Sequence, residues 1–236
     1  TLASVPVESV VSASASAVVV VAGSSVNAST GDAVIVADTG ATVRGANAFE
    51  YREQSVIADV SPAVGQVGTV VTISGQRLLG HGSSVSGVTL NGVAASVRNA
   101  SGTEIVAVAA ASGATGVGDV VVTADTGAQT VAVNAFEYAA AGVIANVAPS
   151  SGQYKTRVTV TGTNLLGHGN GTASVTLAGR EATVLSESNT EVVVAAAAGP
   201  GSQVTGDVVI TADTGAVISS SNAFTYLVAG RVQSVQ

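Results

Sequence analysis

The amino-acid sequence predicts an all-β protein made of tandem β-sandwich repeats of about 87 residues. The first observation is internal repetition. Segments beginning at Gly31, Gly118 and Gly206 share the pattern Gly-Asp-x-Val-x-x-Ala-Asp-Thr-Gly, and each closes on Asn-Ala-Phe-x-Tyr. The second observation is that short runs of Val, Ile and Thr alternate with Gly, Ser and Asn, which is the composition of strands and tight turns.

A second landmark, Leu-Leu-Gly-His-Gly, agrees with this repeat length and helps to set the domain boundaries. It occurs at Leu78–Gly82 and again at Leu165–Gly169. We expect the chain to be a window on a longer array, in which linkers of about four residues hold neighbouring repeats end to end. The repeat phase divides the chain into residues 1–55 (the later part of a repeat), 56–142 and 143–230 (complete repeats) and 231–236 (the first strand of a following repeat).

The middle repeat shows how the strands are spaced. No segment has a helical period of 3.6 residues, and β-branched runs bounded by turn residues predict seven short strands. Seven strands at this spacing are typical of a sandwich of two antiparallel sheets. The predicted strands are Val56–Val60, Thr69–Ser74, Gly87–Leu90, Ala94–Val97, Glu104–Ala109, Asp119–Ala124 and Val131–Tyr138.

The aromatic residues support a packed core in each repeat. Six of the seven occur in one repeated position, as Phe-x-Tyr pairs. Residues two apart on a strand point to the same face, so each pair is expected to fill one end of a core otherwise lined by Val, Ile, Leu and Ala. A ligand-stacking platform is the alternative. The pairs are Phe49/Tyr51, Phe136/Tyr138 and Phe224/Tyr226.

The composition excludes several kinds of protein. A formal net charge of −7 with a single lysine offers no basic cluster for nucleic acid. The absence of cysteine excludes disulfides and thiolate metal sites. The densest apolar run, Ala17–Ala22, is far shorter than the roughly 20 residues of a membrane-spanning helix. No membrane insertion of this segment, no cofactor and no nucleic-acid partner are therefore expected.

Ordered motifs of the complete repeats resemble a known family. In the middle repeat they are Val-Ser-Pro-Ala-Val-Gly (Val60–Gly65), Gly-Thr-Val-Val-Thr-Ile-Ser-Gly (Gly68–Gly75), Val-Thr-Leu-Asn-Gly (Val88–Gly92) and the closing segment Val120–Tyr138. Together they resemble the IPT/TIG family of immunoglobulin-like domains, over the whole chain. The resemblance implies an early-type sandwich in an elongated array. It implies no single function, because such units occur in receptor ectodomains, bacterial adhesins, extracellular enzymes and transcription factors.

Asp-Thr-Gly is the first motif that invites a catalytic interpretation. The triplet surrounds the catalytic carboxylate of aspartic proteases, where two carboxylates share a proton. Here each copy falls between the last two predicted strands of a repeat, where a hairpin needs Asp and a glycine of positive φ. Copies one repeat apart are too distant to form a dyad, so we interpret all three as turns. They begin at Asp38, Asp125 and Asp213.

His81 and His168 occupy the same loop in successive repeats. A metal site needs several convergent ligands, and each repeat offers one histidine with no acidic residue beside it. We therefore predict loop contacts for both residues, with a weak pH-sensitive contact between repeats as the alternative. Asp119 and Asp207 are each without the second acidic residue that a calcium site needs. The Gly-rich loops do not precede a helix, unlike the loops of phosphate-binding sites.

Three Asn-x-Ser/Thr sequons fall in predicted loops, at Asn27, Asn99 and Asn170. An oligosaccharyltransferase reaches such loops, so they are candidate N-glycosylation sites if the protein is secreted by a eukaryote. They do not occupy equivalent positions of the repeat.

Near-identical repeats, short linkers and no catalytic constellation predict a structural, non-enzymatic protein. The expected role is a stalk, fibre or filament outside the cell or at its surface, which associates with neighbouring copies of the same array. The Val- and Ala-rich stretch Ser12–Ala22 is a candidate edge for lateral packing. The alternatives are a cell-adhesion or receptor module that binds a protein or glycan, with Leu78–Ser84 and Leu165–Thr172 as contact loops, and an accessory domain of an extracellular enzyme.

Overall fold

The computed structural model describes residues 1–230, and among these every regular element is a β-strand. The predicted all-β fold class of tandem sandwiches is therefore confirmed. The chain divides into two compact parts, Thr1–Val56 and the part that begins at Ile57. The second part contains both complete repeats. The strand predicted over residues 231–236 lies outside the described residues.

The first part contains four strands in two separate two-stranded sheets. In the first sheet β1 (Ser9–Ala13) pairs antiparallel with β2 (Val18–Val21). In the second sheet β3 (Ser29–Val36) pairs antiparallel with β4 (Thr42–Tyr51). The predicted edge Ser12–Ala22 therefore falls on the first of these hairpins.

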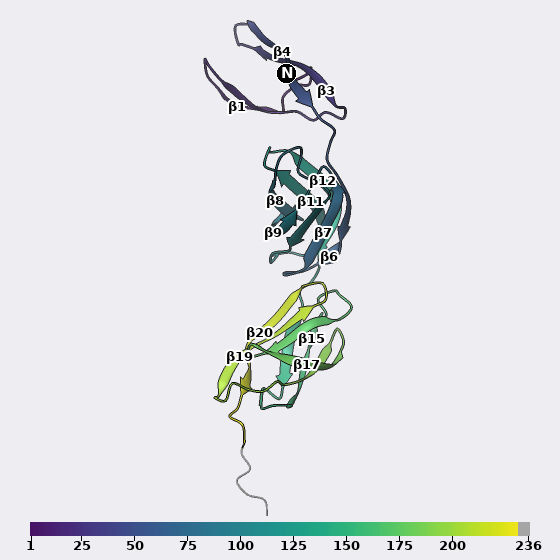
Figure 1. Cartoon of the computed structure of the whole chain (residues 1–236), viewed down its shortest axis with the longest axis vertical. Helices are drawn as coiled ribbons and strands as arrows, with labels where there is room; N and C mark the ends of the chain where they lie inside the picture. Colours follow the sequence, from purple (N-terminus) through teal and green to yellow (C-terminus); the bar gives the residue numbers. More distant parts are fainter. Residues whose placement is uncertain (231–236) are drawn as a thin grey trace, which may run out of the picture. The chain divides into compact units, whose positions relative to one another are not determined.

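In the middle repeat, drawn from blue to teal in Figure 1, eight strands are hydrogen-bonded in the order β5-β7-β10-β9-β8-β11-β12-β6. The long strand β9 joins the two layers of the sandwich. Its start pairs with β8 and its end pairs with β10. The bounds are β5 (Val56–Ser61), β6 (Val64–Gly65), β7 (Val70–Gln76), β8 (Val85–Leu90), β9 (Val93–Ala100), β10 (Glu104–Val108), β11 (Gly116–Ala124) and β12 (Gln129–Tyr138).

All seven predicted strands of this repeat are present, and the sandwich contains one pairing beyond the predicted antiparallel ones. The structure adds the two-residue strand β6, which pairs parallel with the end of β12, Val64 opposite Glu137 and Gly65 opposite Tyr138. The chain reaches this position by crossing from one layer to the other after β5. Two residues are too few to show a period, so the sequence pattern contains no sign of β6.

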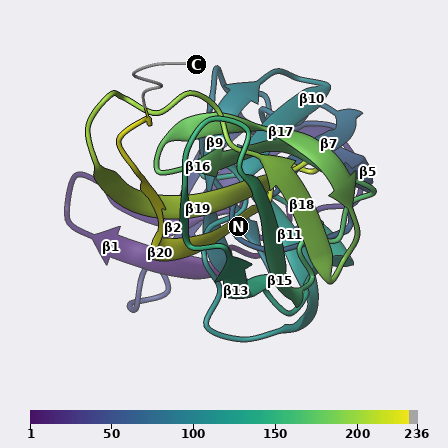
Figure 2. The same cartoon turned by 90° about the horizontal axis from the view of Figure 1, so that it is seen from below.

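The third repeat has the same topology, β13-β15-β18-β17-β16-β19-β20-β14. Figure 2 shows it end-on, with β15 and β18 on one side and β19 and β20 on the other. Its strands are β13 (Val143–Ala148), β14 (Ser151–Gly152), β15 (Arg157–Thr163), β16 (Thr172–Leu177), β17 (Arg180–Glu187), β18 (Glu191–Ala195), β19 (Val204–Ala212) and β20 (Val217–Tyr226).

Each complete repeat folds around a core of its own. The core of the middle repeat contains Ile73, Leu90 and Phe136, and that of the third repeat contains Leu177, Ile210 and Phe224. No buried residue belongs to both clusters. Since apolar burial is the main favourable term in folding, each sandwich contains what it needs to fold by itself.

The Phe-x-Tyr pairs lie where the sequence predicts. Phe136 and Tyr138 are fully buried, and their rings meet edge to face with centroids 5.1 Å apart. The corresponding pair in the third repeat has the same geometry. Phe49 and Tyr51 also meet edge to face, with centroids 5.0 Å apart, and are half-buried. Burial also raises the pKa of Tyr138.

Candidate functional site

The Asp-Thr-Gly triplets form the turns between the last two strands of each repeat. Gly40, Gly127 and Gly215 have φ values of 84°, 84° and 85°, a backbone conformation that favours glycine. The strands on either side are antiparallel partners in all three repeats. The geometry is that of a hairpin turn, as the sequence indicates.

The aspartate of the middle turn holds a neighbouring loop in place. The Asp125 carboxylate accepts hydrogen bonds from the backbone amides of Ser83 and Ser84, at 3.1 Å each, and from both hydroxyls. These bonds, led by that of the Ser83 hydroxyl, lower the pKa of Asp125. In the third repeat Asp213 accepts a bond from the Asn170 amide in the same way. The carboxylate therefore closes the Gly-His-Gly loop against the turn.

Asp119 and Asp207 also have structural partners. The Oδ1 atom of Asp119 accepts the Asn134 amide at 2.8 Å, and that of Asp207 accepts the Asn222 amide at 2.8 Å. Both asparagines have positive φ and follow a register shift between the last two strands. These carboxylates therefore stabilise a β-bulge.

The most extensive polar site in the second part is the junction between the middle and third repeats. The turn of the third repeat lies against the chain that leads into β7. The Val70 amide donates to the Thr214 carbonyl at 2.8 Å, and the Val217 amide donates to the Val67 carbonyl at 3.1 Å. The Asp-Thr-Gly turn is thus a docking element as well as a hairpin.

Two glycines allow this close approach. A Cβ atom on Gly68 would lie 2.8 Å from the Gly215 carbonyl oxygen. One on Gly215 would lie 2.6 Å from Cγ2 of Val70 and 3.0 Å from the Gly68 carbonyl oxygen. Both glycines also have positive φ. A side chain at either position would therefore push the two repeats apart.

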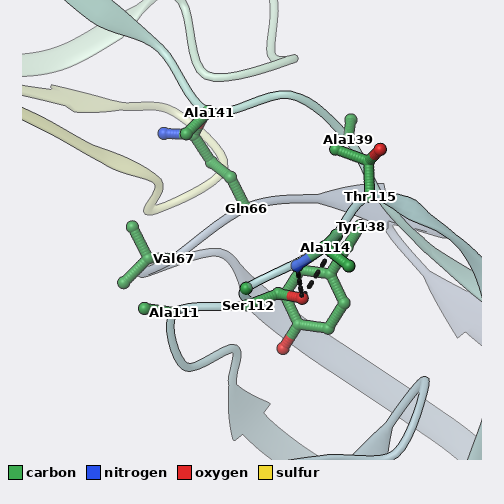
Figure 3. Close-up of a pocket in the computed structure, with 10 residues that line it drawn as sticks. Gln66, Val67, Ala111, Ser112, Ala114, Thr115, Tyr138, Ala139 and Ala141 are labelled. Atoms are coloured by element: carbon green, nitrogen blue, oxygen red, sulfur yellow. Dashed lines mark hydrogen bonds between the residues drawn. The ribbon is translucent and has the colours of Figure 1, made fainter.

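Gln66 connects the junction to the linker. Its side chain is 2% exposed and extends from its loop toward the linker at Ala141, as Figure 3 shows. Its Oε1 accepts the Gly142 amide at 2.6 Å, and its Nε2 donates to the Val217 carbonyl at 3.3 Å. One buried amide thereby fixes both the linker and the docked turn.

A depression of about 520 Å³ lies beside Gln66. Its walls are the loop Ala111–Thr115, the linker and Tyr138 (Figure 3). Small side chains dominate, and the Ser112 hydroxyl is engaged with the backbone of Ala114. Its lining carries the hydroxyls of Ser112, Thr115 and Tyr138, and no carboxylate, histidine, lysine or arginine side chain.

The structure gives a side-chain contact for His168 and a backbone conformation for His81. His168 Nε2 lies 2.8 Å from the Ala140 carbonyl, and Asn164 donates to the same oxygen at 3.2 Å. The predicted loop contact of His168 is therefore with the linker. His81 occupies the equivalent loop position with a φ of 59°.

The predicted glycosylation sites Asn27, Asn99 and Asn170 are exposed. Asn99 lies in strand β9, whereas the sequence places it in a loop; the other two lie outside strands. An exposed side chain is necessary for modification, and glycosylation of the three remains a prediction.

Residues 1–230 contain no group of three or more His, Asp or Glu side chains placed to hold a metal ion. Over the same range no helix has the length and hydropathy of a membrane span.

Comparison with known proteins adds the following findings. The IPT/TIG domain family matches residues 55–138 and 143–226. Curated protein sequences give no match. Among solved structures, the extracellular region of plexin A4 superposes with a TM-score of 0.50 at 22% identity, over 75% of this chain and 16% of that one. This likeness shows the fold alone.

Surface proteins that bind glycans are also among the structural matches. SGBP-B from a xyloglucan utilization locus of Bacteroides uniformis has 23% identity and a TM-score of 0.31, over 72% of this chain and 49% of that one. A Bacteroides ovatus SGBP-B in complex with a mixed-linkage heptasaccharide has 15% identity and a TM-score of 0.31, over 83% and 51%. The chain thus spans about half of these proteins, or less.

Proposed function

This chain belongs to the IPT/TIG domain family, and from that premise we propose that it is a non-catalytic structural segment of a long extracellular repeat protein. Its role is to form part of a stalk, fibre or filament at the cell surface. The observation that carries this proposal is the junction between the middle and third repeats. Backbone hydrogen bonds and the buried Gln66 side chain hold the two sandwiches together there.

A protein that acts as a spacer, or that displays another group, needs its neighbouring units at a fixed distance and orientation. A flexible linker would let them rotate, since inter-domain motion is the default where the interface is small. Here the turn of one repeat fits the chain of the preceding one at two glycines, Gly68 and Gly215. Such nearest-neighbour contacts hold two adjoining repeats of an array in a fixed relation.

The experiment that tests this proposal compares two glycines in the same turn position. Gly215→Ala places a Cβ against Val70, whereas Gly127→Ala places one where there is nothing within 4 Å. Both positions have a φ near 84° or 85°, so the backbone strain is the same in the two variants. We expect only Gly215→Ala to free the junction, as measured by residual dipolar couplings of the two repeats.

Equal residual dipolar couplings in the two variants and in the unchanged chain would show that the Asp-Thr-Gly turn does not fix the relative orientation of the two repeats. Independent tumbling of the repeats in the unchanged chain would also contradict the structural role. Electron microscopy of the full-length protein provides a second measure, because a stalk or fibre appears as an elongated particle.

A binding role, with a glycan or protein partner, is the second candidate function. The observation that favours it is Tyr154, the one aromatic residue outside the repeated Phe-x-Tyr position, whose exposed fraction is 64%. Exposed aromatic rings are common anchors in recognition sites. Screening the chain and its Tyr154→Ala variant against an array of glycans tests this role, and identical profiles for the two would reject Tyr154 as an anchor.

A further inference from the structure

The third repeat carries the same docking turn as the middle repeat, with different side chains. In the middle repeat the Gln66 amide donates to Thr69 Oγ1 at 3.0 Å and the Thr69 amide donates back to the Gln66 carbonyl at 3.1 Å. Gln153 and Thr156 exchange the same two bonds, at 2.8 and 3.0 Å. The backbone of the turn is therefore conserved between the two repeats.

The side chains on this turn prevent a second junction of the same kind. Lys155 takes the place of Gly68, with a φ of 64° against 88°. Its Cβ atom occupies the position that a Cβ atom would have on Gly68. In the junction between the middle and third repeats, that position is 2.8 Å from the Gly215 carbonyl oxygen. Backbone atoms cannot approach a Cβ so closely. The turn that begins at Gln153 therefore does not accept an Asp-Thr-Gly hairpin as the turn at Gln66 does.

The residues that replace the docking surface are suited to a different ligand. Tyr154, Lys155 and Arg157 stand where the middle repeat has Val67, Gly68 and Val70, and all three are exposed. Lys155 Nζ lies 5.5 Å from the centroid of the Tyr154 ring, within cation–π range. Lys155 is the only lysine of a chain whose net charge is −7, and Arg157 adds a second exposed cation two residues further along.

Tyr154 and Lys155 border a depression of about 500 Å³ in the third repeat, whose other lining residues are Thr183, Leu185 and Ala195–Ala198. Arg157 is the cross-strand neighbour of Ala195, which in turn neighbours Thr183. Opposed residues of adjacent strands share a face of the sheet, so the guanidinium group and the Thr183 hydroxyl are on the same side as the depression.

We infer that this surface, Tyr154–Arg157 with the adjoining depression, is a binding site for an acidic oligosaccharide. The apolar face of a sugar ring packs on the Tyr154 ring. Lys155 and Arg157 pair with the sugar carboxylates, and a guanidinium group suits a carboxylate by two parallel hydrogen bonds. This inference goes beyond the structural role and rests on the binding role given above as the second candidate.

The test measures binding of a short oligogalacturonate to the full chain by calorimetry and by amide shifts in NMR spectra. A neutral maltooligosaccharide of equal length and a poly-glutamate peptide are the comparison ligands. We expect the oligogalacturonate to bind most tightly, with amide shifts at the turn Gln153–Arg157 and at Thr183. Raising the salt from about 0.05 M to about 0.5 M should weaken it, because partly exposed ion pairs are screened.

The matched variant is Tyr154→Val/Lys155→Gly/Arg157→Val, which restores the residues of the middle repeat on the same backbone turn. It should lower the affinity for oligogalacturonate by about tenfold or more. A second variant, Lys155→Gln/Arg157→Gln, keeps the side-chain size and should have a similar effect. Val131→Gly, at an exposed position of the middle repeat, should leave the affinity unchanged.

Four results would overturn the inference. Equal affinity of the unchanged chain and both variants would show that the sugar binds elsewhere. Equal binding of the maltooligosaccharide would show that charge plays no part, while leaving the general binding role in place. Tighter binding of poly-glutamate would identify the surface as a site for acidic peptides. Failure of both sugars to bind at millimolar concentration would remove the glycan-binding role as well.

Discussion

Two glutamines at equivalent positions of the repeat show how one residue sets the relation between sandwiches. Gln66 is buried and bonds to both the linker and the docked turn. Gln153 is half-buried and donates to Val228 in the following linker at 2.9 Å. Gln153 Oε1 also accepts the Gly230 amide at 3.4 Å, as Gln66 Oε1 accepts the Gly142 amide. Both side chains therefore hold the linker that follows their repeat, and Gln66 in addition bonds to the Val217 carbonyl of the docked turn.

Replacing each glutamine by alanine should therefore have unequal effects. Gln66→Ala leaves the Gly142 amide without its partner at a part-buried site, at a cost of about 1–3 kcal/mol in the free energy of unfolding. Gln153→Ala should cost clearly less, because its contacts are exposed. Denaturant titration of both variants measures the difference, and equal losses would contradict the junction described above.

Phe136 provides a test of the core. It is fully buried against Tyr138, and its replacement by alanine should lower the free energy of unfolding by about 3–5 kcal/mol. The exposed Tyr154, replaced in the same way, should leave stability nearly unchanged. Chemical denaturation of the two variants compares them, and an unaltered midpoint for Phe136→Ala would refute the core assignment.

The hydrogen bonds of Asp125 predict that the stability of one loop, the loop that contains Ser83 and Ser84, depends on pH. Its pKa is lower in the folded chain than in the unfolded chain, so its contribution to stability is fully present above about pH 4 and is lost as the pH falls through the folded value. The protection factors of the Ser83 and Ser84 amides, which correct for the intrinsic pH dependence of exchange, should then fall. Asp125→Asn should give low protection factors at every pH, and pH-independent protection in the unchanged chain would contradict this account.

At the scale of the elements, the sequence was sufficient for the strands that have a visible pattern. The β-branched runs predicted β7, β10 and β11, and the Asp-Thr-Gly triplets predicted the turn before β12. It was insufficient for β6, which is too short for a period, and for the shared strand β9. A residue pattern shows which face of a strand is buried, but not which neighbours the strand pairs with at each end.

The docking role of the turn was not predictable for a related reason. Gln66 and Val217 are 151 residues apart, and neither belongs to a motif with a known chemistry. The available signal was a contrast between repeats: Gly68 corresponds to Lys155, although both occupy a turn of positive φ. In near-identical repeats, the positions that differ carry information that the shared positions do not.

At the scale of the whole molecule, the hairpin of β1 and β2 is the surface proposed for lateral association. Val10, Val11 and Val19 are exposed on it, and exposed apolar side chains favour contact between copies. Val11→Lys should reduce such association, and Val133→Lys, at an exposed valine of the middle repeat, serves as the control. Analytical ultracentrifugation measures both, and equal self-association of the two variants would exclude this edge.

The glycine at position 68 also has a consequence for inheritance. Near-identical repeats encourage unequal recombination, which inserts, deletes or exchanges whole sandwiches without disturbing their cores. The docking turn restricts which exchanges are neutral, because a sandwich with Lys155 on its turn cannot take the place of one with Gly68 beneath a following hairpin. The two sandwiches have the same fold, but they cannot exchange places along the chain. Their order along the chain is therefore itself a heritable property.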